Sequence, residues 1–303
     1  MASSVAPDNI AFANAVVFSD GILQTISRAL RVMINPGTNW RAGYPERIVC
    51  LTEETTETLY LLGEQDRIVG ISGFTVRPPE ARKTKPKVSA FTSAKIQRIV
   101  ELKPDLVIGF SDLQADIAKD LVALGINTLV FNQRSVQEIL SMILTLSGMV
   151  GCADRGRALV DGYIERLNSV RTAGNALPRR PRVYFEEWDE PMISAIAWVS
   201  ELIGIAGGED VFGKLGVQSH AKNRIIADGQ TVIDANPDVI IGSWCGKKFR
   251  PEKVADRIGW ESVTAVKTQQ LHEIKSPLIL QPGPAALSDG LDELHQIISA
   301  AAQ

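Results

Sequence analysis

A loop in the last quarter of the chain carries residues suited to covalent chemistry. The sequence SWCGKK begins at Ser243 and places Cys245 two residues before Lys247 and three before Lys248. Neighbouring cations lower the pKa of a thiol, so this setting favours a thiolate that attacks an electrophile or ligates the metal of a bound chelate. The other interpretation is that Cys245 is a small residue at a strand end, and the sequence favours it.

A cluster of acidic residues is the second candidate for chemistry. Glu186, Glu187 and Asp189 could hold a divalent cation, or the two glutamates could start a helix, where acidic residues favour the dipole. The histidines lack the spacing of metal ligands, although the first lies in a loop that could approach a binding site: His220, His272 and His295. We therefore expect no metal site made by the protein alone. No phosphate-binding, dinucleotide-binding or nucleophile-elbow motif is present to support an enzyme.

The elements that must position these residues alternate along the chain. Short β-rich runs alternate with segments of helical spacing, which predicts an α/β fold with parallel central sheets flanked by helices. The first half has such strands at 47–51, 67–71, 106–109 and 127–131, with helices at 52–63, 93–102 and 113–124. After a long helical stretch from 136 to 173 and a break at 178–181, strands follow at 182–185, 239–242 and 271–274.

The two halves of the chain resemble each other. Residues 101–109 read ELKPDLVIG and residues 234–242 read DANPDVIIG, each a helix end, then Pro-Asp, then a buried strand. This repetition predicts two lobes of similar build joined by one long, rigid helix. We expect an N-terminal extension at 1–45, an N-terminal lobe at 46–150, a linking helix at 151–178 and a C-terminal lobe at 179–303.

Ligands of open α/β sheets bind beyond the carboxyl ends of the strands, so the segments that follow the strands predict the site. These segments combine aromatic side chains, which give flat apolar contacts, with cations that meet acidic groups. That combination suits a bulky, amphiphilic ligand. The residues that we expect to bind it are Phe74, Arg77, Glu187, Trp188, Trp244, Cys245, Lys247 and Lys248.

About 250 residues resemble the class III periplasmic substrate-binding proteins of ABC importers, which take up cobalamin and iron siderophores. The resemblance rests on RIVCLTEETTETLYLLG from residue 47, KVSAFTSAKIQRIVELKPDLVIG from residue 87, and PLILQPGPAALSDGLDEL near the end. It implies two α/β lobes with a ligand between them and a rigid connecting helix near 154–173. Aromatic residues at Phe74, Trp188, Trp198 and Trp244 favour the cobalamin branch.

The resemblance implies a non-enzymatic protein without a resident cofactor that delivers a metal chelate, with a cobalamin-like corrinoid as the favoured ligand, to an ABC permease. The chain departs from the family pattern where the permease docks, because residues 85–88 contain no acid and the second lobe offers Asp228 and Gln230 instead of a glutamate. The first 45 residues do not match a secretory signal. A periplasmic location, a cytoplasmic chelate sensor or chaperone, and an enzyme using Cys245 therefore stay open.

Composition excludes several other classes. The chain has 303 residues and a formal net charge of −3, without the clustered basic excess of a nucleic-acid-binding protein. Three widely spaced cysteines indicate neither a disulfide scaffold nor a structural zinc site. No apolar run reaches the length of a membrane span. We expect a monomer.

Overall fold

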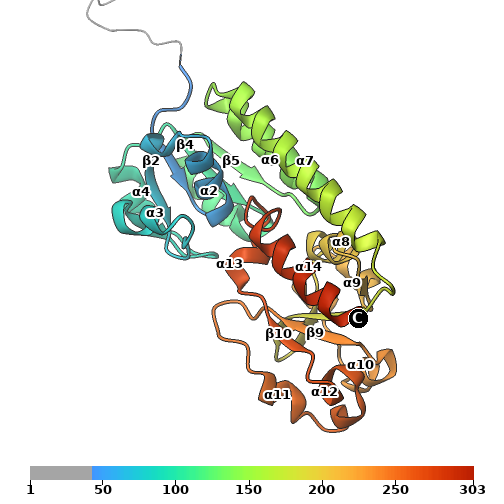
Figure 1. Cartoon of the computed structure of the whole chain (residues 1–303). Coiled ribbons are helices and arrows are strands. Elements are labelled where there is room, and N and C mark those ends of the chain that lie inside the picture. Colours follow the sequence, from blue (N-terminus) through green and yellow to red (C-terminus); the bar gives the residue numbers. More distant parts are fainter. Residues whose placement is uncertain (1–42) are drawn as a thin grey trace, which may run out of the picture. The chain divides into compact units, whose positions relative to one another are not determined.

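The computed structural model describes residues 43–303, and two five-stranded sheets organise them (Figure 1). The strands of the first sheet are all parallel and lie in the order β3-β2-β1-β4-β5. They are β1 (Ile48–Cys50), β2 (Ile68–Ser72), β3 (Lys87–Ser89), β4 (Leu106–Phe110) and β5 (Thr128–Phe131). The helices between them are α2 (Glu53–Leu61), α3 (Pro79–Thr84), α4 (Ile96–Glu101) and α5 (Ala115–Ala123).

The central strand β1 is covered on both faces, as its unbroken apolar sequence predicts. Successive side chains of a strand point to opposite faces. Ile48 and Cys50 accordingly belong to one core cluster with Leu59 of α2, whereas Val49 packs with Leu121 of α5 on the other side. Cys50 is fully buried, which leaves it a core residue.

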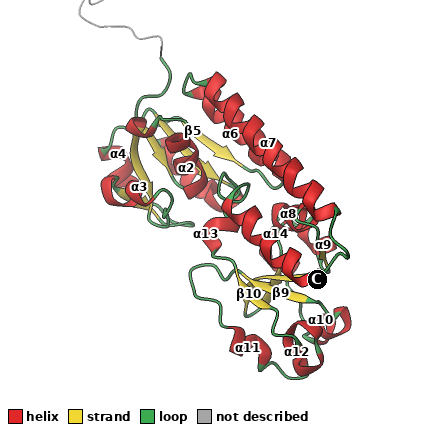
Figure 2. Ribbon diagram, viewed as in Figure 1, coloured by secondary structure: helices red, strands yellow, loops and turns green. Residues whose placement is uncertain are grey.

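Two long helices follow the first sheet, α6 (Val136–Met149) and α7 (Ala153–Asn175), and Figure 2 shows them side by side. Ser135 caps α6 by accepting a hydrogen bond from the Glu138 backbone N–H at 3.2 Å. The close packing of the pair needs a glycine at position 156, because a Cβ there would lie 1.9 Å from Oγ of Ser147. The α7 helix then leads to the second sheet.

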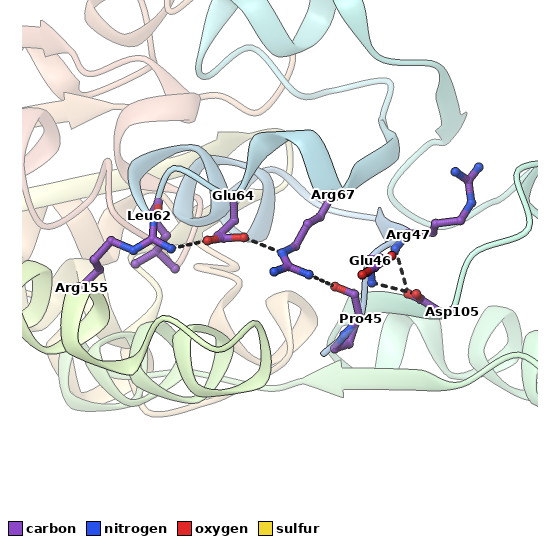
Figure 3. A network of polar contacts seen from close by, with 8 residues as sticks. All are labelled: Pro45, Glu46, Arg47, Leu62, Glu64, Arg67, Asp105 and Arg155. Atoms are coloured by element: carbon purple, nitrogen blue, oxygen red, sulfur yellow. Dashed lines mark hydrogen bonds and ion pairs between the residues drawn. The ribbon is translucent and has the colours of Figure 1, made fainter. Parts of the chain in front are cut away.

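A polar network ties the start of α7 to the first lobe (Figure 3). The Arg155 guanidinium binds the Leu62 carbonyl and the Glu64 carboxylate, which also binds Arg67. Arg67 in turn donates to the Pro45 carbonyl at 2.7 Å. Burial raises the pKa of Glu64, but the two guanidiniums outweigh it and lower that pKa below its usual range.

The second sheet has the order β10-β9-β6-β7, and β8 pairs with the start of β6. It is parallel except for β7, which runs antiparallel to β6. Its strands are β6 (Arg182–Asp189), β7 (Met192–Ser194), β8 (Glu209–Asp210), β9 (Val239–Gly242) and β10 (Leu271–Glu273). The helices are α8 (Ala197–Ile205), α9 (Gly213–Gly216), α10 (Gln230–Ala235), α11 (Pro251–Ala255), α12 (Thr264–Lys267), α13 (Ser276–Ile279) and α14 (Asp289–Ala301).

The expected fold class is confirmed: two lobes have parallel central sheets flanked by helices, and one long helix, α7, lies between them in the chain. The sequence did not indicate the short elements β3, α3, β7 and β8. It also placed the end of β6 too early. Glu186 and Glu187 lie within that strand, so the alternative that they start a helix is wrong.

Most of the expected extension at 1–45 lies outside the described residues. In the part of the chain that the structure describes, no helix is both long enough and apolar enough to span a membrane.

Candidate ligand-binding site

Buried polar atoms without a partner in the protein gather where the two sheets end. Residues 43–303 contain eight such side-chain atoms. Six of them belong to residues that follow a strand, and a seventh belongs to Arg224, which binds Glu187 near the end of β6. These seven residues, called the strand-end site below, are Glu53, Glu54, Thr75, Gln133, Arg134, Arg224 and Ser243. Buried polar groups in folded proteins are nearly always hydrogen-bonded, so a cluster of unpaired ones indicates a place for a ligand or ordered water.

Two carboxyl groups form one part of the strand-end site. Glu53 and Glu54 follow β1 in the first turn of α2, and both are buried. Glu54 Oε1 accepts a hydrogen bond from the Thr52 hydroxyl at 2.6 Å, and Glu53 accepts one from the Val76 backbone N–H. Burial, together with the charge of Glu54, raises the pKa of Glu53 to about 8, and burial raises the pKa of Glu54 to about 7.

Arg134 follows β5 and forms a cationic part of the site. Its guanidinium lies 5.0 Å from the centre of the Phe110 ring, and Nη2 donates to Asn132 Oδ1 at 3.1 Å. Asp112 lies 3.4 Å from the same nitrogen. Burial lowers the pKa of Arg134 and the charge of Arg224 in the second lobe lowers it further, whereas Asp112, Glu138 and Glu187 raise it. The Nε of Arg134 has no partner in the protein.

Arg224 is the cation that the second lobe contributes to the strand-end site, as Arg134 is that of the first lobe. It is 1% exposed and binds both carboxylate oxygens of Glu187, at 2.6 and 3.2 Å, and the Ser194 carbonyl. Its Nε has no partner in the protein. Glu187, one of the expected ligand-binding residues, therefore already serves as the partner of a buried arginine.

Trp244 lies in a core, not on a free surface. It is 3% exposed, its ring packs edge-on against Phe249 at 5.0 Å, and its Nε1 donates to Glu186 Oε1 at 3.0 Å. Glu186 also accepts hydrogen bonds from Arg257 at 2.6 Å and from the Tyr184 hydroxyl at 2.8 Å. Trp244 thus fixes the loop that continues to Cys245.

The two lysines of that loop have different surroundings. Lys247 binds Asp189, and its Nζ lies 4.0 Å from the centre of the Trp188 ring and 5.0 Å from that of Trp244. Trp188 donates from Nε1 to the Glu190 carbonyl at 2.9 Å. Lys248 is exposed.

The alternative in which the neighbouring lysines lower the pKa of Cys245 is wrong. The thiol is exposed, yet desolvation by the surrounding atoms, followed by the charges of Glu187 and Glu53, raises the pKa of Cys245. Lys247 does not offset this, because Asp189 and the two indole rings hold its ammonium group. Glu187 belongs to the second lobe and Glu53 to the first, so the thiol lies where the lobes face each other.

Several contacts join the lobes around the site. His220 Nδ1 lies 3.6 Å from Asp112 Oδ2, so the loop of His220 does reach the first lobe. Gln133 donates from Nε2 to the Pro282 carbonyl at 3.0 Å. A Cβ at Gly283 would lie 2.4 Å from Cβ of Glu54, which shows how tightly this segment covers the carboxyl pair.

Arg77 joins the lobes as well. Its guanidinium binds Glu57 at 2.9 Å and Asp289 of the second lobe at 2.9 Å, while Glu57 also accepts a hydrogen bond from the Ala285 backbone at 3.2 Å. Phe74, three residues earlier, is 55% exposed. Of these two expected ligand-binding residues, only Phe74 has a side chain free of such partners.

The three residues of the acidic cluster are each paired with a cation. Within residues 43–303, no group of three or more His, Cys, Asp or Glu side chains is arranged to hold a metal ion. Glu186, Glu187 and Asp189 each have a cation of their own: Arg257, Arg224 and Lys247 respectively.

Six of the eight expected residues lie on the second lobe, around Glu187 and Cys245, and none of the eight belongs to the strand-end site. Glu53, Glu54, Gln133, Arg134 and Ser243 follow predicted strands, so their positions were a usable signal. Arg224 gave no such signal, because it ends a short 3-10 helix (Ala221–Arg224) that follows no predicted strand and lies 37 residues from Glu187 in the sequence.

A groove of about 670 Å³ lies elsewhere, between α6, α7 and α8. Its Arg180 donates to the carbonyls of Gly204 and Gly208, both at 3.0 Å, and its Arg171 contacts Asn168. None of the buried unpartnered atoms of the described residues belongs to its lining. The strand-end site is therefore the stronger candidate.

A family model described as periplasmic binding protein matches residues 48–278. The chain belongs to this family. An uncharacterised ABC transporter substrate-binding lipoprotein of Bacillus subtilis is 25% identical over 270 residues, which cover 84% of this chain and 80% of that protein. A vitamin B12-binding protein of Vibrio parahaemolyticus is 28% identical over 172 residues, covering 55% of this chain and 61% of that protein.

Solved structures of this family show the same fold. A periplasmic heme-binding protein from Roseiflexus sp. RS-1 has a TM-score of 0.75 at 22% identity, with 85% of this chain and 99% of that one covered. The periplasmic vitamin B12-binding protein of Vibrio cholerae has a TM-score of 0.68 at 23% identity, with coverages of 85% and 98%. The chain thus has the fold of these periplasmic binding proteins.

Proposed function

We propose that this chain binds a corrinoid, such as cobalamin or cobinamide, at the strand-end site and passes it to the permease of an ABC importer. The observation that carries this proposal is the group of buried polar atoms without partners, which come from both lobes at the carboxyl ends of the sheets. Sites of this kind have a few polar groups that orient a ligand in otherwise closely packed surroundings.

The chemistry of the site favours a corrinoid over haem. The periphery of a corrin ring carries primary amides, which both donate and accept hydrogen bonds. The site offers acceptors on Glu53, Glu54 and Gln133 and donors on Arg134 and Arg224. The propionates of haem supply acceptors only, so they match the arginines but give no donor to the amide oxygen of Gln133 or to the carboxyl groups when these are ionised.

The eight residues expected from sequence stay in the proposal with two roles. The side chains of Phe74, Cys245 and Lys248 are available to contact the ring, and so is Trp188, which is partly exposed although it binds Glu190 and contacts Lys247. Those of Arg77, Glu187, Trp244 and Lys247 already have partners within the protein, so we propose that they hold the loops in place.

The test is retention of colour. The purified protein is incubated with hydroxocobalamin, dicyanocobinamide, haem or ferrichrome, desalted, and examined by visible spectroscopy. We expect a retained corrin spectrum with a stoichiometry near one. Retention of haem or ferrichrome in place of both corrinoids would contradict the ligand class, and retention of none would contradict chelate binding.

A pair of arginine variants locates the site. Arg134→Ala removes a cation at the carboxyl end of β5 and should weaken corrinoid binding by roughly tenfold or more. Arg179 precedes the amino end of β6 and pairs with Asp238. The control variant Arg179→Ala should therefore bind the corrinoid like the wild type. Equal affinities of the two variants would place the ligand elsewhere.

A further inference from the structure

Glu53 and Glu54 combine deep burial with unused hydrogen-bonding capacity. They are 6% and 1% exposed, and Oε2 of each has no partner in the protein. The other oxygen of Glu54 binds the Thr52 hydroxyl, and Glu53 binds the Val76 backbone N–H. A buried carboxylate is costly unless a cation or several donors compensate it.

The protein itself supplies little compensation. The cation that acts most on Glu53 is Arg82, whose guanidinium already binds the carbonyls of Gly73 at 2.6 Å and Thr75 at 3.2 Å. For Glu54 the main influences are burial, the Thr52 hydroxyl and the like charge of Glu57. The Glu57 carboxylate is itself held by Arg77 at 2.9 Å.

Other buried polar groups without partners surround the pair. Thr75 directly precedes Val76, whose backbone N–H binds Glu53. The Thr75 hydroxyl oxygen has no partner within the protein. Gln133 is 4% exposed, and its Oε1 also lacks a donor. Gln133 donates from its amide nitrogen to the Pro282 carbonyl, and Glu54 contacts the adjacent Gly283. The unpaired oxygens of Gln133 and Glu54 therefore belong to side chains that both contact the Pro282-Gly283 segment.

The second lobe faces this group of acceptors. The charge of Glu53 acts on the Cys245 thiol, which belongs to the loop after β9. Ser243, at the start of that loop, is 1% exposed, and its hydroxyl has no partner in the protein. A ligand between the lobes would therefore meet two carboxyl groups, an amide oxygen and hydroxyl groups.

We propose that Glu53 and Glu54 bind a nitrogen donor of the ligand, either a primary amide or a protonated amine. This inference rests on the proposed function and specifies which group of the chelate the first lobe recognises. Hydrogen bonds from such donors to a carboxylate are short and about twice as strong as neutral ones, so they compensate the burial of both side chains.

Proton release is a consequence that can be measured. Because burial raises the pKa of both Glu53 and Glu54, the pair retains protons near pH 7 without ligand. A nitrogen donor favours the ionised form, so binding releases protons near pH 7 and fewer as the pH rises above the raised pKa values. The charged groups facing the pair are Glu57 and Arg82 of the first lobe, with the Cys245 thiol of the second.

Two pairs of chelates test the proposal by isothermal titration calorimetry. Dicyanocobinamide has amide donors, whereas dicyanocobyrinic acid heptamethyl ester has the same ring with esters in their place. Ferrioxamine B has a free ammonium group, and its N-acetyl derivative does not. In at least one pair, we expect the donor-bearing chelate to bind about tenfold tighter or more than its blocked partner, and the pair identifies the donor.

Glutamine variants and buffers complete the experiment. Glu53→Gln and Glu54→Gln should each lose about tenfold in affinity for the donor-bearing chelate. Glu80→Gln, in the exposed first turn of α3, should lose nothing. Titrations in phosphate and Tris, which differ in ionisation enthalpy, report the protons released by the wild type and need no variant.

The outcomes separate the two proposals. Binding of a corrinoid without proton release, or with equal affinity for both members of each pair, overturns the role of the carboxyl groups and leaves the proposed function intact. If a glutamine variant does not fold, proton release measured on the wild type still tests the proposal. If none of the four chelates binds, both proposals fail.

Discussion

The Arg224 guanidinium lies against the Glu187 carboxylate, with nitrogen–oxygen distances of 2.6 and 3.2 Å. This pair fixes the short 3-10 helix Ala221–Arg224 to the end of β6 and carries charge into the space where the lobes face each other. Arg224 is almost fully buried, whereas the Glu187 side chain is 19% exposed. The pair thus connects the stability of the second lobe to the geometry of the strand-end site.

Arg224→Met should lower the stability of the protein substantially. It leaves the carboxylate of Glu187 partly buried without its cation, and breaking a buried ion pair from one side costs on the order of 3 kcal/mol. The urea midpoint measured by circular dichroism checks this. The double variant Arg224→Met with Glu187→Leu removes both charges and should recover part of the loss. A single variant as stable as the wild type would show that the pair is not needed.

Trp244→Ala should act on stability more than on ligand contacts. The side chain is buried against Phe249 and bonded to Glu186, so its removal leaves a cavity that costs about 3–5 kcal/mol. Trp244→Phe keeps most of the volume and should cost less. Thermal unfolding of both variants tests this. Unchanged stability combined with a large loss of corrinoid affinity would instead make Trp244 a direct ligand contact.

Glu54→Gln should stabilise the protein more at high pH than at low pH. A carboxyl group whose pKa rises on folding favours the folded state below its unfolded pKa of about 4.5, and this contribution is lost as the pH rises towards 7. Glu54→Gln does not lose this contribution. The difference in free energy of unfolding between the variant and the wild type should therefore grow in favour of the variant from pH 5 to pH 8, to at most about 3 kcal/mol. Urea unfolding at several pH values measures it, with Glu80→Gln as the control. Parallel pH curves for the wild type and Glu54→Gln would contradict the prediction.

Two glycines of α7 should respond in opposite ways to alanine. Gly162 has open space around a Cβ, so Gly162→Ala should stabilise the helix by about 1 kcal/mol. Gly156→Ala should destabilise the protein, because its Cβ would meet Oγ of Ser147 at 1.9 Å and separate α6 from α7. Thermal melts of the two variants give the comparison. Equal shifts would mean that the helices can move apart without cost.

The amino-acid sequence was sufficient for the fold because its signals are local. The apolar runs of β1, β2, β4 and β5 and the helical spacing between them follow from burial on both faces of a parallel sheet. The Pro-Asp that precedes both β4 and β9 is also a local signal, and its repetition indicated two lobes of similar build. Short elements such as β3 and β8 were missed, because two or three residues are too few to show a period.

The sequence by itself also placed the candidate site at the strand ends, which is a property of the fold class. Only the tertiary structure decided which of those side chains have partners. Arg77 joins Glu57 to Asp289, Lys247 is held by Asp189, and the expected low pKa of Cys245 is reversed by desolvation and by Glu187 and Glu53. These outcomes depend on burial and on charges brought together from distant parts of the chain, which residue spacing does not record.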